Sequence, residues 1–293
     1  MRPRLPQPVS DGQGPAGNRV GTLSNAQALA YLHRDGVPTR LFRGNWWFKY
    51  RPWFFSPLPI LRPLPATAIA RPDVRAIGYR AVCSDPSEAN VATKAVLFTD
   101  LAGYDAQRVS KDRRRELRRA LTAFEYHVLT TPDPLLAQGW GVASRAAAAS
   151  GHTLQRTRRR YEHHAKAMFG GPGPTVVAAF DDNELVAYMT SLGVGDQASL
   201  DELFIAPHVR RRHAGVGLYW HTLRLWAQVP GVNTAYSGLA FPEQPGLDAF
   251  KITMGARVCQ LPTRVGLAPP ARAWLSVRKP AALTRWSAQH SDE

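Results

Sequence analysis

The sequence predicts an α/β chain built on a mixed sheet, and two observations lead to this prediction. Apolar runs of strand length alternate with amphipathic segments of helix length along most of the 293 residues. Between residues 175 and 267 the predicted order is three strands, a helix, a strand, a second helix and a final strand. The 44% hydrophobic content is typical of a folded protein. The length suffices for two modest domains or one large one.

The first half of the chain shows two strand patterns and two helical patterns. Ser110 is a suitable N-cap for a helix that has Leu117 and Phe124 on its apolar face. Pro132 marks a break before an alanine-rich helix that ends near Gly151. The predicted elements are a strand at 95–98, a helix at 111–124, a strand at 125–130 and a helix at 142–150.

The second half of the chain has clearer patterns of strands, helices and turns. Asp181 to Glu184 joins two apolar runs and is a good hairpin signal. Pro230-Gly231 ends a helix whose apolar residues recur at helical spacing from Val216. The predicted elements are a helix at 154–168, strands at 175–180, 185–192 and 200–206, a helix at 216–228, a strand at 232–237, a helix at 247–254 and a strand from 257.

These elements suggest three parts: a disordered lead-in at 1–20, a first domain at 21–150 and a second domain at 151–293. The first residues lack the apolar core of a signal peptide. Prolines interrupt the most apolar stretch, residues 53–70, so we expect no spanning helix. Cys83 and Cys259 lack metal-ligand spacing, and a reducing cytoplasm is the simpler interpretation. His163-His164 has no companion ligand at metal spacing, so no metal is expected.

The net charge of +15, from 37 Lys and Arg against 22 Asp and Glu, suits an anionic partner. Nucleic acid, a phosphorylated cofactor, an anionic lipid and an acidic substrate are all compatible with it. A basic helix at 111–119 is either a solvated face or a surface for an anionic acceptor. Nucleic-acid binding is less favoured, because no helix-turn-helix, zinc-finger or RNP pattern accompanies the charge.

The most informative motif is the glycine-containing segment between the strand ending at Pro207 and the helix that follows. Gly215 and Gly217 open that helix, and three arginines (Arg210, Arg211 and Arg212) precede it. The first turn of a helix has unpaired N–H groups and a positive dipole end, and glycines let a ligand approach closely. The segment therefore predicts a phosphate site. A P-loop and a full dinucleotide fingerprint are both missing.

Residues 175–267 resemble the GNAT superfamily of acyl-CoA-dependent acyltransferases. Arg212, Gly215 and Gly217 match its Arg/Gln-x-x-Gly-x-Gly/Ala pattern, although the loop before Gly215 is about two residues longer than usual. The resemblance implies acetyl-CoA or another acyl-CoA as co-substrate, with the pyrophosphate on the loop backbone and the pantetheine arm along the preceding strand. The implied cofactor-binding residues are Leu203, Phe204, Ile205, Arg210, Arg212, His213, Ala214, Gly215, Val216 and Gly217.

The resemblance also implies a base on the strand before the loop. Asp201 and Glu202 are the candidates, and regular strand alternation lets only one of them face the cleft. Glu202 is slightly favoured, and a carboxylate simply paired with an arginine is as good an interpretation for either. Tyr236 is the candidate acid for the leaving thiolate, and Lys251 could stabilise charge.

A second resemblance, to the FemAB-like branch, rests on the basic helix after the 95–98 strand and on Phe250-Lys251. It implies two GNAT-like halves, the first of them on the substrate side. The expected function is acyl-CoA-dependent N-acyl transfer, an acetyl group to an unknown amine. Two alternatives stay open: a FemAB-like aminoacyl transferase that acts on a cell-envelope precursor, and a non-catalytic nucleic-acid-binding protein.

Overall fold

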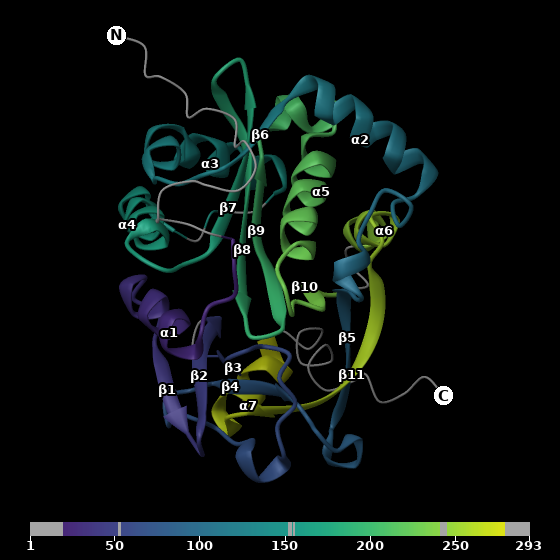
Figure 1. The fold of residues 1–293 in the computed structure, drawn as a ribbon. Helices are drawn as coiled ribbons and strands as arrows, with labels where there is room; N and C mark the ends of the chain where they lie inside the picture. Colours follow the sequence, from purple (N-terminus) through teal and green to yellow (C-terminus); the bar gives the residue numbers. More distant parts are fainter. Residues whose placement is uncertain (1–19, 52–53, 152–153, 155, 241–244, 279–293) are drawn as a thin grey trace.

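The fold comes from a computed structural model that describes residues 20–51, 54–151, 154, 156–240 and 245–278 (Figure 1). The predicted lead-in lies outside the described residues, except for Val20, which packs against a core cluster. The architecture is a mixed α/β one around a single large sheet, which confirms the predicted fold class.

The second half contains every element that the sequence predicts there. The hairpin signal at Asp181–Glu184 becomes the turn between two antiparallel strands. The third strand begins earlier than expected, and the strand at 232–237 is shifted by two residues. The elements are α4 (Arg158–Phe169), β7 (Thr175–Asp181), β8 (Glu184–Val194), β9 (Gln197–Ile205), α5 (Ala214–Ala227), β10 (Thr234–Leu239), α6 (Pro245–Thr253), β11 (Arg257–Leu267) and α7 (Pro269–Arg278).

The first half contains four strands and a helix that the sequence patterns did not predict. The aromatic segments around Trp47 and Phe55 form β2 and β3, and both side chains are fully buried, as expected for core packing. The elements are α1 (Asn25–Arg34), β1 (Thr39–Phe42), β2 (Asn45–Arg51), β3 (Phe54–Pro57), β4 (Gly78–Val82), β5 (Val91–Phe98), α2 (Lys111–Ala123), β6 (Glu125–Val128) and α3 (Trp140–Ala149). No helix in the described parts of the chain is long and apolar enough to cross a membrane.

The eleven strands follow the order β1-β2-β3-β4-β11-β5-β10-β9-β8-β7-β6, so the two halves share one sheet. β11, from the end of the chain, pairs with β4 on one side and β5 on the other, both antiparallel. At the far end β6 pairs with β7. The domain boundary at Gly151 stays a prediction, although α2, β6 and α3, which precede it, all pack on elements that follow it.

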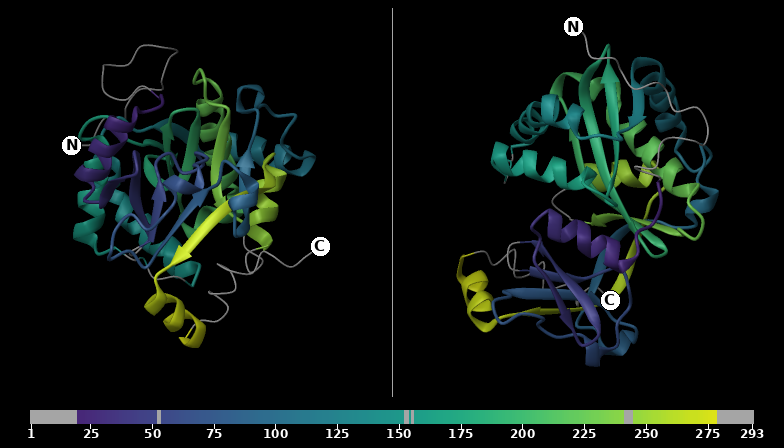
Figure 2. Two further views of the ribbon diagram at one scale, coloured as in Figure 1. Left: turned by 90° about the horizontal axis from the view of Figure 1, so that it is seen from below. Right: turned by 60° about the vertical axis from the view of Figure 1, so that its left-hand side comes forward.

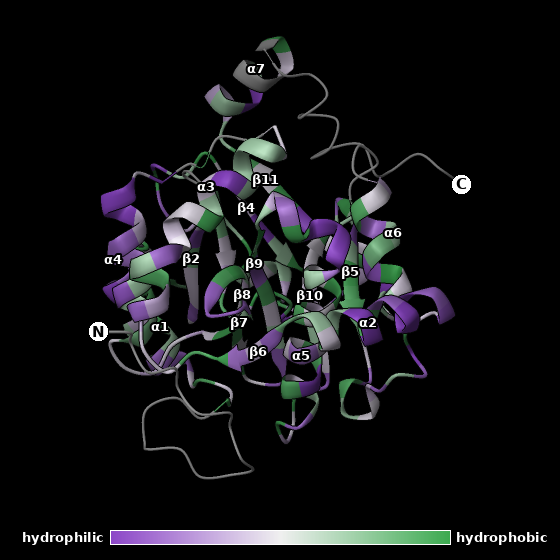
Figure 3. Cartoon of the chain, turned by 90° about the horizontal axis from the view of Figure 1, so that it is seen from above, coloured by the Kyte–Doolittle hydropathy of each residue, from purple (hydrophilic) through white to green (hydrophobic). Residues whose placement is uncertain are grey.

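Helices cover both faces of the sheet in the second half (Figure 2). α3 and α4 lie on one face, over a core that includes Phe180 and Tyr188, and α2 and α5 lie on the other, over a core that includes Val186 and Leu200. α2 and α4 consist largely of hydrophilic residues (Figure 3), because both are rich in arginine.

One irregularity in the sheet positions the candidate site. β9 and β10 run parallel but pair only through Gln197–Ser199 and Thr234–Tyr236. Beyond Ser199 the two strands separate, and residues 200–205 of β9 have no strand partner on that side within the described sheet. The backbone edge of β9 is therefore available there.

The structure generates a stability prediction at the start of α5. A Cβ atom on Gly217 would lie 1.9 Å from the hydroxyl oxygen of the partly buried Tyr126, whereas one on Gly246 would meet nothing within 4 Å. We expect Gly217→Ala to lower the free energy of unfolding by about 1–3 kcal/mol through overpacking. Gly246→Ala, the matched control, should leave it unchanged or raise it by up to about 1 kcal/mol. Chemical denaturation of both variants checks this, and equal stabilities would contradict it.

Candidate active site

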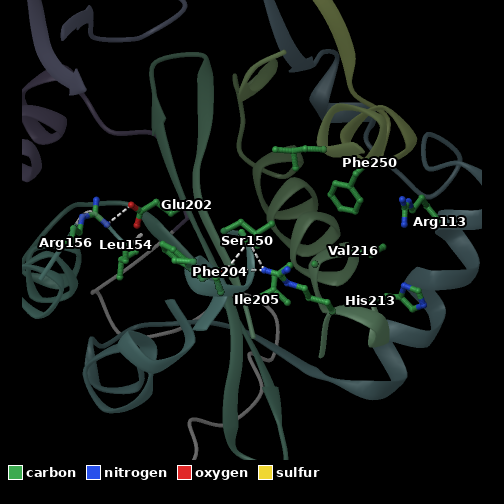
Figure 4. Close-up of a pocket in the computed structure, with 16 residues that line it drawn as sticks. Arg113, Ser150, Leu154, Arg156, Glu202, Phe204, Ile205, His213, Val216 and Phe250 are labelled. Carbon is green, nitrogen blue, oxygen red and sulfur yellow. Dashed lines mark hydrogen bonds and ion pairs between the residues drawn. The ribbon is translucent and has the colours of Figure 1, made fainter. Parts of the chain in front are cut away.

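A cavity of about 660 Å³ opens where β9 separates from β10 (Figure 4). Its walls come from β9, from the first turn of α5 and from α2, α3 and α6. One end lies at Arg156 and Glu202, and the other at His213, Val216 and Phe250. The lining residues are Arg113, Ala146, Ala147, Ser150, Leu154, Arg156, Glu202, Leu203, Phe204, Ile205, Arg210, His213, Gly215, Val216, Leu247 and Phe250. Such a size is typical of small-molecule and cofactor sites.

The anion end of the cavity is the loop before α5. The extra loop length noted in the sequence is a 3₁₀ helix, Pro207–Arg212, after which His213 takes a left-handed conformation and α5 begins. Among the described residues, nothing accepts a hydrogen bond from the N–H groups of Ala214 or Gly215. The Arg210 side chain lies along the cavity wall and donates a hydrogen bond to Ser150 Oγ at 2.9 Å. Unpaired first-turn N–H groups beside an arginine make a cradle suited to phosphate.

Three of the ten predicted cofactor residues lie outside the cavity lining, namely Arg212, Ala214 and Gly217. The Arg212 guanidinium forms a two-pronged ion pair with Asp181 and lies over the Phe124 ring, 4.6 Å from its centroid. Gly217 packs against Tyr126, so a glycine is needed there for close packing. The other seven, Leu203, Phe204, Ile205, Arg210, His213, Gly215 and Val216, all line the cavity.

A β-bulge places Asp201 and Glu202 on the same face of the sheet, where regular alternation would put them on opposite faces, but only Glu202 lines the cavity. The pairing of β8 with β9 shifts between Thr190 and Ser191, and Asp201 is the extra residue. Leu200 and Leu203 both pack into the core beneath α5, three positions apart. The intervening Asp201 and Glu202 therefore both point to the opposite face, since a bulge breaks the alternation of a strand.

Glu202 is held between two cationic side chains at the cavity end. Arg156 Nη1 donates to Glu202 Oε1 at 2.5 Å, and His164 Nε2 lies 3.6 Å from Glu202 Oε2. On the far side of the imidazole, Nδ1 lies 3.0 Å from Asp35 Oδ1, but outside hydrogen-bond alignment. Arg160 in turn donates to Asp35. A chain of alternating charges thus leads from the cavity to the end of α1.

This chain shifts the pKa values of both of its central groups. Burial favours neutral Glu202, but the His164 contact and the Arg156 charge outweigh it, so the pKa of Glu202 is lowered. Burial also disfavours charged His164, yet contacts with Asp35 and then Glu202 raise the pKa of His164. Both shifts favour an ionised Glu202 beside a protonated His164.

Asp201 differs from Glu202 although the two are adjacent. Loss of surrounding solvent is the largest cause that raises the pKa of Asp201 to about 7, with the Glu202 charge adding to it, while Ser199 opposes the shift. The side chain itself is exposed and does not line the cavity. Because water reaches this carboxylate, it ionises more readily than a carboxyl buried in protein.

The structure does not bring Tyr236 and Lys251 into the cavity lining. Tyr236 is buried beside Arg80 on another part of the sheet, and burial raises its pKa to about 12. Lys251 is buried in α6 and donates to the Ser237 carbonyl oxygen at 2.5 Å. Burial lowers the pKa of Lys251, with Asp248 opposing the shift. Its neighbour Phe250 lines the cavity instead.

The sequence patterns missed Asp35, Arg156 and His164. One signal was present for His164, which shares a helical face with the buried residues Tyr161, Ala165 and Met168. A histidine on an apolar face needs a polar partner, but nothing in the local sequence identifies that partner. Asp35 follows α1, a helix that the patterns did not predict, and Arg156, which the patterns placed inside a helix at 154–168, precedes α4. Only the tertiary fold relates the two residues to Glu202.

The charge chain predicts how stability depends on pH. Since the folded-state pKa of His164 is raised above its usual 6.5, this group stabilises the fold fully below about pH 6.5 and loses that effect as the pH rises through the folded-state pKa. We expect the stability difference between wild type and His164→Gln to be larger at pH 5.5 than at pH 9. His163→Gln, which removes an exposed histidine from the same helix, is the matched control. Urea denaturation across this range checks the prediction, and a pH-independent difference for His164→Gln would contradict it.

Comparison with known proteins supports the fold. No family model and no curated protein sequence matches the chain. Among solved structures, the C-terminal domain of a proposed lysylphosphatidylglycerol synthetase from Agrobacterium fabrum matches at 10% identity and a TM-score of 0.57, over 90% of this chain and 93% of that one. L-PGS from Bacillus licheniformis matches at 13% identity and a TM-score of 0.54, over 91% and 93%.

The structure of FemX matches at 9% identity and a TM-score of 0.56, over 85% of this chain and 92% of that chain. Identities this low establish the architecture and leave the activity open. The matches extend over both halves of the chain, and the division into two GNAT-like halves stays a prediction. The chain therefore has a GNAT-like fold that resembles the folds of FemX and L-PGS.

Proposed function

We propose that the chain is an N-acyltransferase that moves an acyl group, acetyl in the simplest case, from acyl-CoA to an amine. The observation that favours this most is the course of the cavity. It begins at the unpaired N–H groups of α5, follows the unpaired edge of β9 and ends at the ionised Glu202. Transfer from acyl-CoA needs a site for the pyrophosphate, a strand edge for the pantetheine arm and a carboxylate as base. These three features follow one another along the cavity in the order in which the donor would meet them.

The seven predicted cofactor residues that line the cavity suit the parts of the donor. The N–H group of Gly215 and the Arg210 guanidinium would hold the pyrophosphate. The free edge of β9 at Leu203 to Ile205 would bind the amide groups of the pantetheine arm, as an added strand would. When bound, acyl-CoA supplies an acyl carbonyl activated as a thioester.

Glu202 is the base in this proposal. When the amine nitrogen attacks the thioester carbonyl, Glu202 would accept the proton that the nitrogen loses, directly or through one water. The carbon–sulfur bond then breaks, and CoA leaves as its thiolate, which takes up a proton from Glu202 or from solvent. Position favours Glu202 over Asp201, because only Glu202 lines the cavity. Arg156 and His164 would fix the orientation of the carboxylate and keep it ionised. His164 and Asp35 are positioning residues here.

A specific observation also favours the aminoacyl-tRNA alternative. Arg113 of α2 lines the cavity, while Arg115, Arg118 and Arg119 of the same helix are exposed on the outer surface. A basic helix that leads into the cavity suits an RNA-linked donor as well as a small anionic one. Binding that depends steeply on salt, together with no affinity for CoA, would favour this alternative.

Arg210 and its neighbour Arg211 allow a test of the proposed donor. Arg210 lines the cavity, whereas exposed Arg211 does not, so both variants change the charge equally but only one changes the site. Because Arg210 is partly solvated, we expect Arg210→Gln to weaken acetyl-CoA binding about 5- to 10-fold. Arg211→Gln should leave it within about twofold, and Gly215→Glu should abolish it. Isothermal titration and thermal shift measure this, since a ligand specific for the folded state raises the melting temperature. Wild-type protein without affinity for any acyl-CoA would exclude the proposed donor.

The adjacent carboxylates Asp201 and Glu202 allow a test of the proposed base. Glu202→Gln should lower kcat about 10²- to 10⁴-fold with little change in the Kd of acetyl-CoA, and Asp201→Asn should change kcat less than about tenfold. The pH profile of kcat/KM adds a second test. With the pKa of Glu202 lowered, its protonation limits the rate only below about pH 4.5. A loss of rate below pH 7 that Asp201→Asn abolishes would assign the base to Asp201 instead.

A further inference from the structure

Arg80 is a buried arginine whose side chain the proposed mechanism does not use. It lies in β4, and only 7% of its surface is exposed. Its guanidinium donates to the Tyr236 hydroxyl at 3.4 Å and lies 6.0 Å from the centroid of the Tyr50 ring. The two tyrosines come from β10 and β2, so three separate strands converge on this one cation.

The Arg80 cation has no counter-charge within the described residues. Arg40, Arg156, Arg160 and Arg212 each pair with a carboxylate, but no described carboxylate pairs with Arg80. A tyrosine does not supply the missing charge. Burial, the largest cause, raises the pKa of Tyr236 to about 12 even though the Arg80 charge lowers it, so the phenol stays neutral.

An arginine in such a place has unused binding capacity. A guanidinium carries five N–H donors in a fixed fork that matches a carboxylate or a phosphate, and the Tyr236 bond uses one of them. Arginines are almost never buried without a partner, because burying an uncompensated charge is costly. A bound anion is the simplest physical reason to keep the cation there.

The position of Arg80 relates it to the cavity. Tyr236 stands opposite Ser199, the last paired residue before β9 and β10 separate. The residues on either side of Tyr236 face α5. Ala235 belongs to the core beneath that helix, and Ser237 forms a hydrogen bond with the hydroxyl of Tyr219 in α5. Tyr236 therefore points to the other face of the sheet, the face on which Asp201 and Glu202 also lie.

We propose that Arg80, with Tyr236 and Tyr50, binds an anionic group, a carboxylate or a phosphate, of the substrate that accepts the acyl group. The acceptor amine would lie at Glu202 and its anionic group at Arg80, both on the face of the sheet away from α5. Assigning the anion to an acceptor rests on the proposed function. Anion binding at Arg80 does not rest on it.

The first experiment tests anion binding without any assay of activity. The full-length chain is labelled with ¹⁵N-arginine, the Arg80 Nε–Hε resonance is assigned by its loss in Arg80→Lys, and sodium acetate and sodium phosphate are titrated in at constant ionic strength. We expect a saturable shift of this resonance with at least one of the two anions. Exposed Arg75 is the internal control and should show no saturable shift. No movement of Arg80 with either anion, or equal movement of both arginines, would overturn the proposal.

The second experiment tests the link to the acceptor with matched amines. β-Alanine is compared with β-alaninamide, and phosphoethanolamine with ethanolamine, so that each pair differs in one anionic group. Arg80→Gln should raise KM at least tenfold for the anionic member of one pair. The pair that shows this effect identifies the group bound at Arg80 as a carboxylate or as a phosphate. Arg75→Gln should not change it. Equal KM changes for charged and neutral amines would overturn the acceptor assignment.

The two proposals fail in different ways. If no amine is acylated but the Arg80 resonance titrates, the proposed function fails and the anion site stands. If acylation occurs but Arg80 neither titrates nor discriminates between the amines, only the anion site fails. Arg80→Met gives one more readout: in buffer free of binding anions, its melting temperature should equal or exceed that of wild type, because the variant removes an uncompensated buried charge.

Discussion

The separation of β9 from β10 is the constraint on which the rest of the site depends. Two parallel strands that stayed paired to their ends would leave no cavity and no free backbone edge. Here pairing stops after Ser199, and α5 packs beneath the gap with its first turn against β9, where Ile205 meets Gly215. The same gap brings groups from α2, α3 and α6 around one space. Catalytic potential therefore arises from missing hydrogen bonds in an otherwise continuous sheet.

Most of the second half could be predicted from its sequence, since its elements are long, periodic and bounded by Gly, Pro or Asp-Asn turns. The strands of the first half could not. β1 to β3 are four to seven residues long, and the aromatic segments that form β2 and β3 lack a clear alternation. β4 and β5 are joined in the sheet by β11, which comes from a distant part of the chain. Local patterns do not contain that information.

The part of the candidate site formed by the local backbone at the start of a helix could be predicted from the sequence. The part formed by contacts between distant residues could not. The glycine at 215 and the arginine at 210 were identified because a helix start has an inherent preference for anions. The bulge at Asp201 has no local signal, so regular alternation wrongly assigned the two carboxylates to opposite faces of the sheet, although only Glu202 lines the cavity. Gly217 fits the family pattern, yet the structure explains it by contact with Tyr126, a residue 91 positions earlier in the chain. The same sequence feature can thus have two physical causes.

The placement of β11 has a consequence for how the chain is made. β4 and β5 are separated in the sheet by β11, which is synthesised about 160 residues after β5. Until residues 257–267 leave the ribosome, each of the two earlier strands has an open hydrogen-bonding edge, and edges of this kind invite pairing with other chains. The first half of the protein therefore cannot complete its sheet until residues 257–267 have been synthesised.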